Sequence, residues 1–256
     1  MEIKFLGTGS AEGVPVIGCN CKHCRIALKE KKSRRLRSSI LINHNNESIL
    51  IDAGIDIRQQ LLKFNINKIN IILITHEHFD HAYGLKEFKF WNGVNKPILC
   101  APQSLLRKIS SLYEEAIQCD KLTLKPIKPY IFTKIGSFQI KPVRIIHTNY
   151  SFGYVIKTKE VKFVYLSDIA AINPSIMKKY KTHLSNSTYL IINTPFFIGQ
   201  KGKHMGVFDA IELGKKLNSR YIILNHFNHY NKPYNELSKL VKGTALISFD
   251  GMVLKR

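Results

Sequence analysis

Hydrophobic and polar positions alternate along this chain in short runs that predict strands interspersed with helices. The segment Ile69–Ile74 is typical of a buried strand. Similar runs predict strands over 3–6, 39–42, 48–51, 138–144, 152–157, 162–166, 189–192 and 221–224. Apolar residues at helical spacing, such as Ile57, Leu61 and Phe64, predict helices over 56–64, 102–117 and 207–217. The two halves share this style and no linker separates them, so we expect one α/β domain over residues 1–256.

The composition is that of an ordinary globular protein, with 45% hydrophobic and 22% charged residues. No apolar run approaches the roughly 18 residues that span a bilayer. The first residues also lack the basic segment followed by a long apolar segment that is typical of a secretory signal. We therefore expect a cytoplasmic protein that does not associate with membranes.

The charge is strongly positive, with 39 Lys and Arg against 18 acidic residues, a net charge of +21 and a pI near 9.8. Such a balance favours an anionic partner, including nucleic acid. However, only 9 of the 39 cations are Arg, the residue best suited to bidentate phosphate and base recognition. A lysine-coated surface that reflects general composition explains the charge equally well, and we expect the basic run Lys29–Arg37 to be solvated. In either case a small anionic substrate would be attracted.

The five cysteines do not resemble a disulfide framework, because their number is odd and three are crowded together. We expect Cys100 and Cys119 to be simple thiols. Cys19, Cys21 and Cys24 lie within six residues and predict a thiolate zinc site in a loop over about 18–25. Zinc needs a fourth ligand. His23 is adjacent to Cys24 and awkwardly placed, so His229 is the better candidate.

The strongest chemical signal is the segment Thr75–His81, which reads THEHFDH and directly follows a predicted buried strand. In extended chain, His76, His78 and Asp80 project to one side, and a turn lets His81 point back. Three imidazoles and a carboxylate would be costly to crowd together without a cation. Imidazole and carboxylate ligands suit Zn, Mn or Fe, and paired centres of this kind form two-metal hydrolytic sites.

Further candidate ligands come directly after other predicted strands. His147 follows the run over 143–146, Asp168 follows the run over 164–167, and His226 follows the run over 221–224. Each residue alone is more typical of a polar side chain with ordinary hydrogen-bond partners. Their common placement just after strands favours metal binding by all three. Asp52 also ends a strand, and we expect it to orient a ligand imidazole from behind.

These motifs, together with Gly7-Thr8-Gly9 and the segment Leu50–Gly54, resemble the metallo-β-lactamase superfamily over essentially the whole chain. The resemblance implies a four-layer αβ/βα sandwich, an α/β (α+β) fold, with two divalent ions, Mn or Zn, at one edge. It further implies that one metal is held by His76, His78 and His147. The other is held by Asp80, His81 and His226, and Asp168 bridges the two.

The segment Gly7–Pro15, followed by the cysteine cluster, resembles one branch in particular, the phosphoribosyl cyclic phosphodiesterases (PhnP-like proteins). This resemblance implies a structural zinc on Cys19, Cys21, Cys24 and His229, and a homodimer. It implies hydrolysis of a small cyclic phosphodiester, such as phosphoribosyl 1,2-cyclic phosphate or a 2′,3′-cyclic nucleotide, by a hydroxide that bridges the two metals. His204 would lie near the phosphate, so His204 and Asp80 are the expected catalytic residues.

Three other functions are compatible with the same sequence features. A nuclease of the tRNA 3′-processing type uses the same metal core, and the +21 charge favours it, although we see no Gly/Pro-rich inserted arm. The sensitivity of activity to ionic strength would discriminate, because a polyanion releases many counterions. A thioester or lactam hydrolase is compatible with the fold alone. A non-catalytic metal-dependent binding protein is the weakest alternative, because the ligand set is complete.

Overall fold

The computed structural model describes residues 1–118, 120–170, 174–200 and 204–255, and the side chains of 174–176 are left undescribed. Their strands form two seven-stranded sheets. The first sheet has the order β14-β1-β2-β3-β4-β5-β6, with strands β1 (Glu2–Gly7), β2 (Ser39–His44), β3 (Glu47–Ile51), β4 (Ile71–Leu73), β5 (Ile98–Ala101), β6 (Thr123–Pro126) and β14 (Val253–Lys255). The second has the order β13-β12-β11-β10-β9-β8-β7, with strands β7 (Thr133–Ile135), β8 (Phe138–Arg144), β9 (Phe152–Lys157), β10 (Lys162–Leu166), β11 (Tyr189–Asn193), β12 (Tyr221–Asn225) and β13 (Leu246–Ile247).

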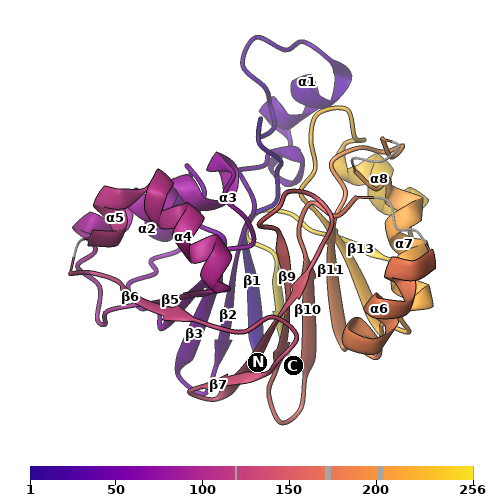
Figure 1. Cartoon of the computed structure of the whole chain (residues 1–256). Helices are drawn as coiled ribbons and strands as arrows, with labels where there is room; N and C mark the ends of the chain where they lie inside the picture. Colours follow the sequence, from indigo (N-terminus) through magenta and orange to yellow (C-terminus); the bar gives the residue numbers. More distant parts are fainter. Residues whose placement is uncertain (119, 171–173, 201–203, 256) are drawn as a thin grey trace.

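The two sheets pack face to face in the middle of the molecule (Figure 1). One face of each sheet contributes to the apolar layer between them, with Phe5 and Ile51 from the first sheet and Tyr165 and Ile191 from the second. Side chains alternate along a strand, so the intervening residues point outward toward the helices. This alternation gives both sheets two buried faces.

Helices cover both outer faces. They are α1 (Lys22–Lys29), α2 (Ile57–Lys63), α3 (Phe79–Ala82), α4 (Gln103–Leu112), α5 (Glu114–Gln118), α6 (Pro174–Leu184), α7 (Val207–Lys216) and α8 (Tyr234–Leu240), with 3₁₀ turns η1 (Lys31–Ser33) and η2 (Tyr83–Phe90). Helices α2, α4 and α5 lie beside the first sheet, and α6, α7 and α8 lie beside the second (Figure 1). The predicted four-layer αβ/βα sandwich is therefore confirmed. None of the helices in the described ranges is long and apolar enough to cross a membrane.

Several strand ends converge at one edge of the sandwich, and this edge positions the site. Strands β3 and β4 are parallel, as are β10, β11 and β12. Strand β8 runs antiparallel to β9, which in turn runs antiparallel to β10, so β8 and β10 end on the same side. The carboxyl ends of parallel strands are where open α/β sheets place their ligand sites.

Most of the predicted elements are present, and two expectations about them need correction. The helix expected over 102–117 is interrupted at Tyr113, between α4 and α5. The cysteine loop contains the helix α1, which begins at Lys22 and projects from the sandwich (Figure 1). Cys100 is a buried free thiol, as expected, whereas Cys119 lies outside the described residues.

The prediction that the whole basic run Lys29–Arg37 is solvated was wrong at Arg35, which is only 2% exposed. Its guanidinium donates to the Thr8 hydroxyl and to the Ser248 carbonyl, and its carbon lies 4.3 Å from the centre of the Phe227 ring. Arg35 thus connects the N-terminal loop to the end of the second sheet. A charge count cannot reveal this role, because it depends on partners that lie 27 to 213 residues away in the chain.

Candidate metal centre

Three histidines form the first group of donor atoms. His76 Nε2 lies 3.0 Å from His78 Nδ1, and His147 Nε2 lies 3.3 Å from the same nitrogen. His76 is fully buried, His147 is half-buried and His78 is exposed. The group is therefore anchored in the protein on one side and accessible on the other.

Two carboxylates and two imidazoles form the second group, and all four residues are buried. His81 Nε2 lies 3.1 Å from Asp80 Oδ2 and 3.1 Å from Asp168 Oδ2. His226 Nε2 lies 3.1 Å from Asp168 Oδ1. Within each group the donor atoms lie within 4.8 Å of one another.

Asp168 joins the two groups. Its Oδ2 lies 3.4 Å from His76 Nε2 as well as 3.1 Å from His81 Nε2. Despite these short distances, two of the buried donor atoms, His81 Nε2 and Asp168 Oδ1, have no hydrogen-bond partner of suitable geometry among the described residues. Buried polar atoms are normally satisfied, and mixed imidazole and carboxylate donors this close together suit divalent transition metals. The residues present therefore fit a pair of metal ions.

The extended geometry expected for His76–His81 is only half right. The chain is extended as far as His78, but α3 begins at Phe79, so Asp80 and His81 lie on a helical turn. This turn separates Asp80 from His76 and His78 and directs it to the second group. The turn packs tightly, because a Cβ added at Gly54 would lie 1.9 Å from the Asp80 carbonyl oxygen.

Asp52 and Thr75 fix the orientation of two of the imidazoles. Asp52 Oδ2 accepts a hydrogen bond from His81 Nδ1 at 2.7 Å, and the Thr75 backbone N–H and hydroxyl donate to the same carboxylate. The Thr75 hydroxyl therefore accepts from His76 Nδ1 at 3.0 Å. Both rings carry their proton on Nδ1 and present Nε2 to the other donors.

Ser38 orients the His226 imidazole in the same way as Asp52 and Thr75 orient His81 and His76. Its hydroxyl donates to the Gly9 carbonyl at 2.9 Å, so it accepts from His226 Nδ1 at 3.0 Å. Sequence reasoning identified Asp52 but missed Ser38 and Thr75. The position of Thr75 directly before the histidine motif could have indicated its role. Nothing in the local sequence distinguishes Ser38 from the neighbouring serine.

The backbone is left-handed at three of these positions, with φ of 63° at Asp52, 37° at Asp168 and 62° at His226. Non-glycine residues adopt this conformation at some cost in free energy, and it recurs at functional sites. Each of the three residues directly follows or nearly follows a strand. The left-handed turn aims its side chain across the sheet edge.

Burial and the neighbouring charges hold the two carboxyls and three of the imidazoles, those of His76, His147 and His226, in the forms that bind metals. Burial raises the pKa of the Asp80 and Asp168 carboxyls, but the adjacent His81 and His226 outweigh it and lower both values. Burial lowers the pKa of His147 to about 4 and lowers that of His76 and His226. For His81, Asp80 and Asp52 outweigh burial and raise the pKa. Most of the imidazoles are therefore neutral beside ionised carboxylates.

A pocket of about 180 Å³ opens beside the donors. Its lining residues are Ser10, Ala11, Glu12, His78, Asp80, His147, Asp168, Pro195, Phe196, His204, His226 and Asn228. The His204 ring lies 5.4 Å from the His147 ring and 5.8 Å from the Phe196 ring. His204 thus faces the pocket without belonging to either donor group. A larger hollow of about 460 Å³ beside Trp91 contains none of the donors.

The cysteine cluster forms a separate set of donors. His229 Nδ1 lies 3.2 Å from Cys19 Sγ, 3.8 Å from Cys21 Sγ and 3.7 Å from Cys24 Sγ. His23 points elsewhere, with its Nδ1 at 3.0 Å from the Asn231 carbonyl oxygen. The structure therefore brings His229, rather than His23, to the three thiols.

Comparison with known proteins supports this picture. The model of the beta-lactamase superfamily domain matches residues 47–227. An octanoyltransferase of Porphyromonas gingivalis is 27% identical over 98% of this chain, which covers 51% of that protein. A ribonuclease Z of Staphylococcus carnosus is 30% identical over 61% of this chain and 49% of its own length. The chain thus spans about half the length of these curated relatives.

Among solved structures, a diphosphatase from the PhnP family superposes with a TM-score of 0.85 at 23% identity, over 99% of this chain and 96% of that one. This likeness shows the fold. The donor set is that of a metal-dependent hydrolase. As the histidine motif predicted, the chain belongs to the beta-lactamase superfamily.

Proposed function

We propose that the protein is a dinuclear metal-dependent phosphodiesterase that hydrolyses small cyclic phosphodiesters. The observation that carries this proposal is the pair of donor groups joined at Asp168, beside a pocket that also contains His204. Phosphoribosyl 1,2-cyclic phosphate and 2′,3′-cyclic nucleotides are the substrates we infer. The structural similarity to a diphosphatase from the PhnP family supports phosphoryl chemistry on this fold.

His76, His78 and His147 would hold one metal ion, and Asp80, His81 and His226 the other, with Asp168 shared between them. When bound, two such ions act as Lewis acids and make water nucleophilic near neutral pH. We infer Mn or Zn, since both accept imidazole and carboxylate ligands. Asp52, Thr75 and Ser38 hold three of the imidazoles in the ligating tautomer.

His204 is the residue that we expect to act as the general acid, a role that the metal ligands do not supply. Its ring lines the pocket beside His147 and Phe196, where it can meet a bound substrate. We infer that His204 binds a phosphoryl oxygen and donates a proton to the departing alkoxide. General acid catalysis of this kind is worth about 10²- to 10⁴-fold in rate.

The pocket favours a small substrate. Its volume of about 180 Å³ is below the roughly 300 Å³ at which sites for drug-sized ligands begin. Phe196 supplies one apolar wall, and Ser10 and Asn228 supply polar groups. A cyclic phosphodiester on a single ribose matches this combination of size and polarity better than a folded macromolecule does.

A second candidate is a ribonuclease of the tRNA 3′-processing type. The 30% identity to ribonuclease Z and the net charge of +21 favour it. The activity of such an enzyme would fall steeply with salt, whereas hydrolysis of a cyclic mononucleotide would change little.

We also propose a structural zinc on Cys19, Cys21, Cys24 and His229, since four soft donors without an open position are typical of structural rather than catalytic zinc. This zinc would fasten α1 and its loop to the segment that follows β12. A homodimer remains a prediction from the resemblance, and a cytoplasmic location remains a prediction from the sequence pattern.

The test is hydrolysis of bis(p-nitrophenyl) phosphate and 2′,3′-cyclic AMP by metal-reconstituted protein. We expect His78→Ala to abolish turnover and His204→Gln to lower kcat about 10²- to 10⁴-fold with the metal content unchanged. His44→Gln, on β2, is the matched control and should behave like the wild type. Absence of turnover on both substrates with both metals bound would refute the proposal and favour a polynucleotide.

A further inference from the structure

Two aromatic rings continue from the pocket toward the surface. Phe196 lines the pocket, and its ring lies 5.8 Å from the His204 ring and 6.2 Å from the Tyr230 ring. The Phe196 and Tyr230 rings are nearly parallel, at 23°, and Tyr230 is 69% exposed. Since the His204 ring lies 5.4 Å from that of His147, a row of four rings leads from a metal donor to the solvent. We call Phe196 and Tyr230 the aromatic pair.

The aromatic pair does not contribute to the hydrophobic core. Among the described residues, three clusters of apolar side chains form the core, and neither Phe196 nor Tyr230 belongs to any of them. Other aromatic residues close to them in the chain differ, since Phe197 and Tyr234 both pack against the outer cluster of the second sheet. Apolar groups that remain accessible beside a pocket are typical of ligand sites. We therefore look for a role of the aromatic pair in binding.

Hydrogen bonds hold together the two loops that carry these rings. The Asn231 side chain donates to the Thr194 carbonyl at 3.0 Å. The Asn228 backbone N–H donates to the Pro195 carbonyl at 3.1 Å, and its side-chain oxygen accepts from the Tyr230 N–H at 2.9 Å. A binding group that is fixed before the ligand arrives loses little conformational entropy when the ligand binds. The aromatic pair is therefore preorganised.

The charge in the pocket disfavours a substrate with a second phosphate group. Although the chain has 39 Lys and Arg, none of them is among the described residues that line the pocket. The lining includes the Glu12 carboxylate, whose Oε2 accepts from the Ser10 hydroxyl at 2.6 Å. Like charges repel each other more strongly near a protein than in bulk water. Phosphoribosyl 1,2-cyclic phosphate carries a 5-phosphate that this carboxylate would repel, whereas a 2′,3′-cyclic nucleotide has a hydroxyl at that position.

We propose that the aromatic pair stacks the base of the substrate and thereby selects a 2′,3′-cyclic nucleotide over a cyclic phosphodiester that has no base. In such a nucleotide the base is attached to the ribose carbon next to one that carries a phosphate oxygen. A phosphate held between the metal donors and His204 therefore brings the base within reach of the neighbouring Phe196 ring. Aromatic side chains stack on any base, because every base has a π-face. This inference rests on the proposed hydrolysis and names the part of the substrate that the metals do not bind.

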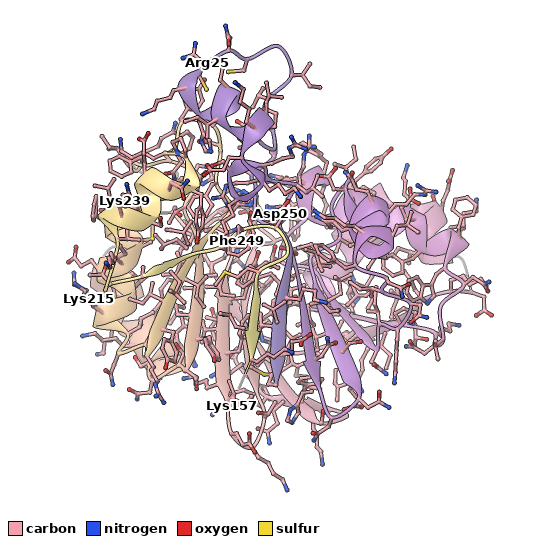
Figure 2. All side chains as sticks on the ribbon, turned by 180° about the vertical axis from the view of Figure 1, so that it is seen from behind. Arg25, Lys157, Lys215, Lys239, Phe249 and Asp250 are labelled. Carbon is pink, nitrogen blue, oxygen red and sulfur yellow. The ribbon has the colours of Figure 1, made fainter. Side chains whose placement is uncertain are left out.

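A second stacked pair provides a matched control away from the pocket. The rings of Tyr189 and Tyr221 lie 5.4 Å apart at 23°, and Tyr221 is 40% exposed. These residues begin the parallel strands β11 and β12, at the end of the second sheet where β10 begins beside Lys157. Lys157 lies at the end of the molecule opposite Arg25 and the cysteine loop (Figure 2). The control pair thus has a similar ring geometry, whereas the metal donors follow the other ends of β10 and β12.

The experiment measures kcat and KM of the metal-reconstituted protein for 2′,3′-cyclic AMP and for methyl riboside 2′,3′-cyclic phosphate, in which a methoxy group replaces the base. Stacking of a base on an aromatic side chain is worth about 5- to 150-fold in binding. We expect the wild type to prefer 2′,3′-cyclic AMP in kcat/KM by about this factor. Tyr230→Leu and Phe196→Leu should each reduce the preference, mainly through KM. Tyr230→Phe keeps the ring and should retain the preference, and Tyr221→Leu should match the wild type.

Equal loss on both substrates in Tyr230→Leu would indicate a purely structural role and overturn the proposal, as would a wild type that hydrolyses both equally well. Equilibrium dialysis of 3′-AMP and ribose 3-phosphate needs no turnover and separates this proposal from the proposed hydrolysis. If neither cyclic substrate is hydrolysed but Tyr230→Leu weakens the binding of 3′-AMP alone, the hydrolysis fails and the base site stands. If both substrates are hydrolysed and 3′-AMP binds no more tightly than ribose 3-phosphate, the base site fails and the hydrolysis stands.

Discussion

Replacing Asp52 with Asn tests how the protein controls its ligand histidines. Asp52 is fully buried and accepts hydrogen bonds from His81 Nδ1 at 2.7 Å, from the Thr75 N–H at 2.8 Å and from the Thr75 hydroxyl at 3.0 Å. An asparagine has the same shape but only one acceptor oxygen, and its amide nitrogen donates. One of the three donors must therefore meet another donor.

The expected consequence depends on which side the amide nitrogen takes. If it replaces Oδ2, it faces the Thr75 hydroxyl and His81, whose ring must accept at Nδ1 and carry its proton on Nε2, the atom that lies 3.1 Å from Asp80 and Asp168. If it replaces Oδ1, the Thr75 N–H is left unsatisfied, at about 1–3 kcal/mol. Loss of such a supporting group typically weakens metal binding by about 10- to 100-fold, or about 1.4–2.8 kcal/mol.

Competition with a chelator, followed by metal analysis, measures the affinity of each of the two ions. We expect the Asp52→Asn variant to hold its less tightly bound ion about 10- to 100-fold more weakly than the wild type. Asp56→Asn is the matched control, because Asp56 is also buried and accepts hydrogen bonds from the Arg37 N–H and from Gln59 at 2.8 and 2.7 Å, away from the donors. Unchanged affinity for both ions in Asp52→Asn would refute this account of tautomer control.

The sequence predicted the architecture well because parallel sheets carry a strong local signal. Strands buried on both faces are almost continuously apolar, as in β11, where all five residues are buried. The same strands end in polar residues that have no apolar role, and this made His147, Asp168 and His226 visible. The confirmed family and fold follow from these two kinds of local evidence.

The parts of the site that sequence reasoning missed are those that depend on distant neighbours. Ser38 becomes meaningful only because His226 lies against it, 188 positions later in the chain. The helical turn that redirects Asp80 is four residues long, too short for a periodic pattern to reveal. Arg35 is buried by Thr8, Ser248 and Phe227, none of which is near it in the chain.

Two further predictions concern the periphery of the site. His229→Ala should retain one zinc fewer than the wild type, whereas His23→Ala should retain all of it, because only His229 faces the thiols; metal analysis after dialysis distinguishes them. The second prediction concerns Asp250, where burial outweighs hydrogen bonds from the Leu36 N–H and the Thr8 hydroxyl and raises the pKa to about 6. The folded state therefore holds the Asp250 proton more tightly than the unfolded state, whose pKa is near 3.8. Its contribution to the free energy of unfolding should fall by about 2 kcal/mol between pH 4.5 and pH 7. Urea denaturation at the two pH values should show that this loss is absent in Asp250→Asn, and an identical pH dependence in the variant would contradict the assignment.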